Sequence, residues 1–283
     1  MVLLALISLL LHFPATEPAA LYLSTDQGNE WTPFTDGLPA DVEIRFVTEQ
    51  AGTLYLGAHG YGVYVLAPGA DVWEQRSTGL PLENEHFPLH PLSLVVRDEL
   101  MILGTFYDGI YVSTDQGNNW RQASPEPYAV TGFVFTDEGI LASSHEGIFH
   151  STDGGTTWQL RGAARIRINA LAEHNGRIIV ARQNGLGVLE EDGVKWSDQT
   201  SEWALLQLLQ QGEYVYALNY RNEIFRSKDG LSWEVPTEEE KTECTGLPDA
   251  VWGGYRPSLL EGVEPGLVTP TSRGWLVGPR SGC

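Results

Sequence analysis

The sequence predicts an all-β fold, a β-propeller of six blades, from three observations. A short motif recurs along the chain, as STDQGNEW at 24–31, STDQGNNW at 113–120, STDGGTTW at 151–158 and SKDGLSW at 227–233. Tryptophans recur every 37 to 47 residues, at Trp31, Trp73, Trp120, Trp158, Trp196 and Trp233. Three short apolar segments precede most of these tryptophans and a fourth follows. Units of four short strands at this spacing are typical of propeller blades.

Each unit predicts its strands in a fixed order. The inner strands are expected at 43–48, 92–97, 130–135, 168–173 and 204–209, where apolar residues alternate with others. The segment SEWALLQLLQQ, which contains the last of these, is helix-like when considered alone. Because it occupies the inner-strand position of its unit, we predict a strand there.

The two ends of the chain predict one shared blade. The chain opens with the third and fourth strands of a unit and ends with PSLLEG at 257–262 and GWLVGP at 274–279, which lack the motif. Pairing these N- and C-terminal strands would remove an open sheet edge and complete six blades. A seventh blade is the alternative if residues 1–13 form a strand. The expected organisation is an export segment at 1–20 and a single propeller domain at 21–283.

Each residue type of the motif Ser-x-Asp-x-Gly-x-x-Trp has a structural role. The carboxylate accepts backbone N–H groups across its own turn, and the serine hydroxyl closes the turn from the other side. Glycine supplies a positive φ, and tryptophan buries its ring and donates its indole N–H. The expected structural residues are Ser24, Asp26, Gly28, Trp31, Ser113, Asp115, Gly117, Trp120, Ser151, Asp153, Gly155, Trp158, Asp192, Trp196, Ser227, Asp229 and Trp233.

On these residues the chain resembles the Asp-box (BNR, bacterial neuraminidase) repeat superfamily of β-propellers. The motif is complete at 24–31, 113–120 and 151–158, shortened at 227–233 and degenerate at 190–196. The superfamily includes sialidases, sortilin-type receptor domains and photosystem II assembly factor-like (YCF48-like) proteins. The resemblance implies that the boxes are structural and that they hold no catalytic residue.

Composition excludes several classes of partner. The chain has 283 residues with 17 basic and 37 acidic side chains, a net charge of −20. Nucleic acid and anionic membranes require clustered Lys and Arg, so neither is an expected partner. A hydrophobic content of 42% supports a sizeable core. We expect a monomer without a cofactor.

The N-terminal segment and the two cysteines indicate in which cellular compartment the protein is expected. The apolar run at 2–11 has the length of a signal-peptide core and is too short to span a bilayer. We therefore expect an extracytoplasmic protein with no membrane span in the mature chain, the alternative being that this run is an inner strand. Cys244 and Cys283 are the only cysteines. They either form one disulfide in an exported protein or remain two free thiols.

Strand order predicts where a ligand would bind. The turns between second and third strands share one face with the links between blades, and that face surrounds the central channel. The candidate binding residues on these turns and links are His59, Tyr61, Phe106, Tyr107, Asp108, His145, Glu146, Arg165, Arg167, Tyr220, Arg221 and Arg256; Asn184, His86, Phe87, His90 and Tyr128 lie there too. The histidines come from separate loops without ligand spacing, so no metal site is predicted.

Two classes of function fit this face. The first is a non-enzymatic protein- or glycan-binding scaffold. The alternative is a sialidase-like glycoside hydrolase, in which the resemblance implies three arginines for the substrate carboxylate, a Tyr–Glu nucleophile pair and an acid/base Asp. Arg165, Arg167, Arg221 and Arg256 are the arginines available, but the Phe/Tyr-Arg-Ile-Pro motif is absent and the charge of −20 would repel an anionic sugar. The binding module is therefore the prediction, with no catalytic residue assigned.

Overall fold

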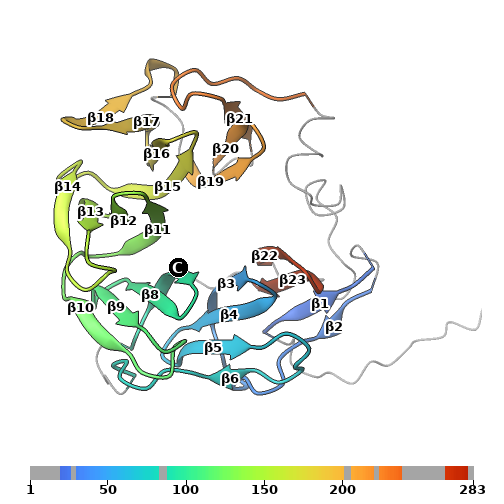
Figure 1. The fold of residues 1–283 in the computed structure, drawn as a ribbon. Coiled ribbons are helices and arrows are strands. Elements are labelled where there is room, and N and C mark those ends of the chain that lie inside the picture. Colours follow the sequence, from blue (N-terminus) through green and yellow to red (C-terminus); the bar gives the residue numbers. More distant parts are fainter. Residues whose placement is uncertain are drawn as a thin grey trace, which may run out of the picture.

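The protein has the all-β propeller fold that its sequence predicts. The computed structural model describes residues 20–26, 30–82, 88–200, 205–219, 223–237 and 265–279. These residues form six antiparallel sheets, five with four strands and one with three. Figure 1 shows β3, β11, β15, β19 and β22 facing the middle of the molecule, with β6, β10, β14 and β18 at its rim.

Strand bounds follow the repeat along the chain. The first full sheet contains β3 (Ile44–Gln50), β4 (Thr53–Ala58), β5 (Gly62–Leu66) and β6 (Glu74–Gln75). The next two contain β7 (Pro91–Arg97), β8 (Leu100–Thr105), β9 (Ile110–Ser113) and β10 (Arg121–Ser124), then β11 (Val130–Thr136), β12 (Gly139–Ser144), β13 (Gly147–Ser151) and β14 (Gln159–Gly162). They are followed by β15 (Ile168–His174), β16 (Arg177–Arg182), β17 (Gly185–Glu190), β18 (Gly193–Trp196), a 3-10 turn η1 (Asp198–Thr200), β19 (Leu205–Gln211), β20 (Tyr214–Asn219) and β21 (Ile224–Ser227).

The remaining sheet joins the two ends of the chain. It consists of β1 (Tyr22–Ser24), β2 (Thr32–Pro33), β22 (Pro265–Thr271) and β23 (Gly274–Pro279), and β1 pairs antiparallel with β23. The inner strand of this sheet is β22, which was not predicted from the sequence. The segment predicted as a strand at 257–262 lies outside the described residues. Pro265 begins the strand, a position that tolerates the missing N–H.

Several sequence predictions concern segments outside the described residues. These are the export segment or strand at 1–13, Gly28, and the pair Cys244 and Cys283. In contrast, the segment that is helix-like by sequence is the strand β19, as its place in the repeat predicts. In the three-stranded sheet, a single bridge between Arg226 and Glu234 stands where the other sheets have a fourth strand.

The inner strand has the same irregularity in all six sheets. Its pairing with the second strand shifts register after its first residue, between Ile44 and Phe46 and at the equivalent position in every other sheet. Such a bulge turns one side chain out of the regular alternation. At the bulge of β11, the Thr131 hydroxyl donates to the Ile168 carbonyl of the next sheet, at 2.9 Å. The bulges therefore shape the face at which the second strands end.

The core lies between the sheets. Side chains of each second strand alternate between two neighbouring sheets: Leu54 and Leu56 pack toward the sheet of the chain ends, and Tyr55 packs toward the sheet of β7–β10. Met101 and Ile102 divide in the same way. Five successive sheet-to-sheet interfaces are described, each filled by one such cluster. Each fully buried aliphatic side chain stabilises the fold by roughly 1.5–3 kcal/mol.

The four repeated turns, here called the Asp turns (24–31, 113–120, 151–158 and 227–233), share one hydrogen-bond pattern. In the third, the Ser151 hydroxyl donates to Asp153 Oδ1 at 2.9 Å and accepts the Gly155 N–H at 2.8 Å. Asp153 Oδ1 also accepts the N–H groups of Thr156 and Thr157. The N–H and hydroxyl of Thr157 are the main cause that lowers the pKa of Asp153 to about 2. Equivalent serine–aspartate bonds occur in the other three Asp turns.

An arginine from the preceding sheet contacts each of five successive outer turns. Arg76 donates to the Gln116 carbonyl at 3.1 Å, and Arg177 donates to the Asp229 carbonyl at 3.2 Å. Three further arginines do the same: Arg121 to Thr156 Oγ1, Arg161 to the Glu191 carbonyl, and Arg273 to the carbonyls of Ala67 and Ala70. We call these five side chains the arginine straps. They also hold the two turns in which the motif is degenerate or lost.

Two adjacent glycines allow the contact between an Asp turn and the preceding sheet to be tested for its contribution to stability. Gly154 and Gly155 both have positive φ, at 71° and 84°. A Cβ on Gly155 would lie 2.7 Å from Ile102 Cδ1 of the preceding sheet, whereas a Cβ on Gly154 would have no atom within 4 Å. We expect Gly154→Ala to cost about 1 kcal/mol, from backbone strain alone. We expect Gly155→Ala to cost roughly 2–4 kcal/mol, because overpacking adds to that strain.

Urea unfolding of both variants measures the difference. Equal losses of unfolding free energy would show that the turn does not press on the neighbouring sheet.

Candidate functional site

The turns that follow the second strands are joined to the links between sheets by backbone hydrogen bonds. Gly60 N–H donates to the Leu89 carbonyl at 2.8 Å, and Phe106 N–H donates to the His90 carbonyl at 2.9 Å. The same relation holds at the turn of the sheet β11–β14, where His145 N–H donates to the Tyr128 carbonyl and the Glu146 carbonyl accepts the Arg165 N–H. Each of these turns therefore lies beside a link that precedes or follows its own sheet. As a result, side chains from three consecutive sheets come together on this face.

Six rings form a continuous aromatic cluster on this face. The rings of His59 and His90 lie 4.8 Å apart, and His90 lies 5.3 Å from Phe106. Phe106 is the centre of the cluster, with Tyr107 at 4.6 Å and Tyr128 at 4.8 Å. The cluster consists of His59, His90, Phe106, Tyr107, Tyr128 and His145. Most of the ring pairs meet edge to face, which is the favourable geometry for aromatic quadrupoles.

The outer part of the cluster is open to solvent. Tyr107 is 49% exposed and Tyr128 is 40% exposed, and their rings lie 5.9 Å apart at 60°. We call these two residues the tyrosine patch. Phe106 contacts both rings and is only partly exposed, so it supports the patch from below. Large exposed aromatic residues on a rigid base are the usual anchors of protein interfaces.

The inner part of the cluster contains polar atoms that are cut off from water. His59 Nδ1, His90 Nε2 and Asp108 Oδ2 are buried and have no hydrogen-bond partner among the described residues. Burial is the main cause that lowers the pKa of His90 to about 4; Arg45 and His59 also lower it, whereas Glu43 opposes them. His90 is therefore neutral at pH 7.

Two further groups at this face have shifted pKa values. Burial lowers the pKa of His145, and the charge of Arg167 adds to this effect. Burial raises the pKa of Asp108. Asp108 in turn contributes, after burial, to raising the pKa of Tyr111 to about 12. Burial thus disfavours the charged forms of His145 and Asp108 in the interior of this face. The tyrosine patch is the polar part of the face that solvent reaches.

Glu146 holds the link that carries Tyr128. Its Oε2 atom accepts the Tyr128 N–H at 2.9 Å, while its backbone carbonyl accepts from Arg165. At the other end of the face, the Tyr61 hydroxyl donates to Asp41 Oδ1 at 2.7 Å. That bond is the largest cause that raises the pKa of Tyr61. Charged side chains here therefore position the loops.

The sequence candidates divide into three groups. His59, Phe106, Tyr107 and His145 are brought together in the cluster, and the link residues His90 and Tyr128 join them. Tyr61, Asp108 and Glu146 lie on the turns beside it, while Arg165 and Arg167 are exposed on the link before β15. Asn184 is exposed on the turn between β16 and β17, away from the ring contacts of the cluster, and the other candidates lie outside the described residues, namely Tyr220, Arg221, Arg256, His86 and Phe87.

Two charged residues at this face escaped sequence reasoning. Arg45 pairs with Glu43 at 2.7 Å beside His90. Both lie within the inner strand predicted at 43–48, where no sequence signal singles them out. The bulge between Ile44 and Phe46 moves Arg45 out of the regular alternation of that strand. A bulge leaves no reliable signal in a single sequence.

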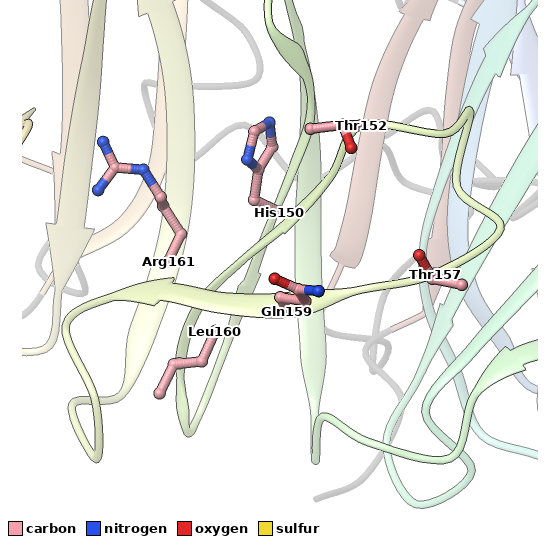
Figure 2. Close-up of a pocket in the computed structure, with 6 residues that line it drawn as sticks. All are labelled: His150, Thr152, Thr157, Gln159, Leu160 and Arg161. Atoms are coloured by element: carbon pink, nitrogen blue, oxygen red, sulfur yellow. The ribbon is translucent and has the colours of Figure 1, made fainter.

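A small hollow lies beside the Asp turn of the sheet β11–β14. Its volume is about 140 Å³, and it is lined by His150, Thr152, Thr157, Gln159, Leu160 and Arg161. Figure 2 shows Leu160 and Arg161 pointing away from each other across their strand. Small-molecule sites usually occupy about 300–1,000 Å³. Because Thr157 belongs to an Asp turn, we regard this hollow as part of the turn structure.

The described residues show neither a metal cluster nor a spanning helix. Within them, no three His, Cys, Asp or Glu side chains gather as ligands. No helix in the described part of the chain is long and apolar enough to cross a bilayer.

Comparison with solved structures supports the fold. The GH74 xyloglucanase from Xanthomonas campestris superposes with a TM-score of 0.61 at 16% identity, over 93% of this chain and 48% of the enzyme. YCF48 from Cyanidioschyzon merolae gives 0.57 at 15% identity, over 93% and 89% of the two chains. YCF48 bound to D1 peptide gives 0.55 at 15% identity, over 78% and 73%. The chain is a β-propeller. At these identities the likeness extends to the fold alone.

Sequence comparisons add no assignment. No family model matches the chain. No curated protein matches it either. The chain spans about half the length of the xyloglucanase it resembles in fold.

The pKa of His90 predicts how this propeller responds to acid. The unfolded chain binds a proton near pH 6.5, whereas the folded protein does so only near pH 4. Stability therefore rises with pH through this window and is lost as pH falls from about 6.5 to 4. After allowance for solvent screening of a half-buried group, we expect a loss of about 1–2 kcal/mol.

Urea unfolding at pH 7.5, 6, 5 and 4 measures this loss. His90→Leu should flatten the pH dependence, and His150→Gln, on the outer hollow, should leave it unchanged. An unaltered slope in His90→Leu would show that another group is responsible.

Proposed function

We propose that this propeller is a non-enzymatic binding module that holds a polypeptide segment on the tyrosine patch. The observation that carries the proposal is the exposure of Tyr107 and Tyr128 on the base formed by Phe106. Tyrosines of this kind supply large contact area at a low cost in conformational entropy. Backbone hydrogen bonds fix the loops that carry them, which lowers that cost further. The fold neighbour YCF48 has been solved with a bound peptide, which is compatible with this use of the fold.

The finer architecture is part of the same proposal. We infer that the six sheets close into one ring of six blades, with the sheet of β1, β2, β22 and β23 as the composite blade. Pairing of β1 with β23 and contact of β22 with β3 support this arrangement. We also infer that the Asp turns are Asp boxes. Their serine–aspartate bonds and the positive φ of their described glycines support the assignment.

Export is proposed on the apolar run at 2–11. An exported protein would also favour a bond between Cys244 and Cys283. Intact mass of the protein recovered from the extracytoplasmic fraction should correspond to loss of about the first 20 residues, with no thiol alkylated under denaturant. Retention of the full chain in the cytoplasm, with two alkylated thiols, would contradict both points.

A sialidase-like hydrolase is the second candidate, and Asp108 is the observation that favours it. Burial raises the pKa of Asp108, as a general acid requires. Three converging arginines are not seen among the described residues of this face: Arg165 and Arg167 are exposed on one link, and Arg45 pairs with Glu43. Arg221 and Arg256 lie outside the described residues. Release of fluorophore from a sialoside by the protein, abolished in Asp108→Asn, would establish this candidate in place of the binding module.

Peptide display tests the proposed binding. A random peptide library is selected on the immobilised protein, and the affinities of the enriched peptides are then measured by calorimetry. We expect the double variant Tyr107→Ser/Tyr128→Ser to weaken them at least tenfold, because anchor residues commonly contribute 1–2 kcal/mol or more each. Val72→Ser and Val235→Ser remove exposed apolar side chains elsewhere and should change nothing. Enriched peptides that bind the double variant as tightly as the parent would refute the proposal.

A further inference from the structure

The charge of the tyrosine patch and its surroundings indicates which peptides it takes. We propose that the segment bound there is cationic, with a lysine or arginine side chain lying over the exposed faces of Tyr107 and Tyr128. This inference rests on the proposed function and specifies its ligand.

Ring geometry decides where a cation can lie. Phe106 meets Tyr107 at 67° and Tyr128 at 72°, with centroids closer than 5 Å. Rings this close leave no room for a cation between them. An aromatic edge carries partial positive charge and a face carries partial negative charge. A cation can therefore approach only from outside the cluster, toward the exposed parts of Tyr107 and Tyr128.

The protein uses this interaction elsewhere. The guanidinium of Arg97 lies 3.6 Å from the centroid of the Phe135 ring, and that of Arg182 lies 4.0 Å from the Trp196 ring. Arg226 and Lys228 lie 4.4 and 4.7 Å from the Tyr214 ring. Aromatic faces on this chain thus repeatedly accept cations from within the chain. The tyrosine patch offers the same kind of surface to a partner.

Electrostatics of the chain favour a positive partner. The net charge of −20 gives a negative field that attracts and steers a basic segment. Near the patch, the Glu146 carboxylate lies 2.9 Å from the Tyr128 nitrogen. Asp41 and Glu43 add two carboxylates at the His59 end of the face, where Glu43 pairs with Arg45.

Two positive side chains oppose this attraction. Arg165 and Arg167 are exposed on the link before β15, and the charge of Arg167 helps to lower the pKa of His145. They disfavour a cation at the His145 end of the cluster. We therefore place the cation toward Tyr107, with a neutral or acidic residue of the ligand on the Arg167 side.

A pair of isosteric peptides tests the proposal. The first probe is a flexible Gly/Ser peptide that carries three lysines, and the second carries three Nε-acetyl-lysines in the same positions. Fluorescence anisotropy gives their affinities for the protein at 50 and 300 mM salt. We expect the lysine peptide to bind at least tenfold more tightly at 50 mM salt and to lose much of that advantage at 300 mM.

Substitutions separate ring recognition from diffuse attraction. Tyr107→Leu and Tyr128→Leu keep apolar bulk and remove the ring, so each should weaken the lysine peptide about two- to fivefold, and both together about tenfold. Tyr128→Phe keeps the ring and should bind as the parent does. Glu74→Gln, on an outer strand, removes one exposed acidic charge and should leave binding unchanged.

The outcomes distinguish this inference from the function on which it rests. Tyrosine-dependent binding of the acetylated peptide with equal affinity would overturn the cationic ligand and retain the peptide-binding patch. Binding of the lysine peptide that survives both leucine substitutions would be diffuse attraction to an acidic protein, and would overturn the inference. If neither peptide bound and the displayed peptides also ignored the tyrosines, both proposals would fall.

Discussion

The structure depends on how each outer turn is fastened to the sheet before it. Within an Asp turn, the serine and the aspartate satisfy the backbone N–H groups that the tight bend exposes, as Ser151 and Asp153 do. Between neighbouring sheets, an arginine strap donates a hydrogen bond to a carbonyl or hydroxyl of the turn. A glycine of the turn allows its backbone to pack against an apolar side chain of the preceding sheet. Buried polar groups left without partners would cost about 1–3 kcal/mol each. With the turns held in this way, the sheets pack against one another mainly through apolar side chains.

Fastening at one end of the sheets leaves the other end available for recognition. The core clusters run between the sheets as far as the ends of the second strands, where residues such as Ala58 and Ser144 are fully buried. Beyond that point the cluster around Phe106 continues the apolar seam to the surface. The tyrosine patch is thus the exposed end of an interface that already stabilises the fold. Its rigidity is a by-product of packing and needs no separate device.

Sequence reasoning predicted the propeller because its signals are local and repeated. The turn motif, the tryptophan spacing and the inner-strand pattern each depend on residues close in sequence, so they locate strands such as β19 even where propensity favours a helix. It did not predict β22, which lies in a part of the chain without the turn motif. It could not foresee the arginine straps, since Arg76 and Arg177 reach their partners across 40 and 52 residues. The partners are defined only by the three-dimensional arrangement of the sheets.

The candidate site shows the same division between local and long-range information. Strand order alone placed His59, Phe106, Tyr107 and His145 on one face, because turn position follows from counting strands. It could not say that Phe106 would become the centre of the cluster, since that depends on the angle between consecutive sheets. Nor could it separate half-buried His90 from exposed Tyr128, although both lie on links. Burial makes His90 neutral and structural, whereas exposure makes Tyr128 available to a ligand. The function proposed for this face therefore rests on a difference in depth between two neighbouring aromatic side chains.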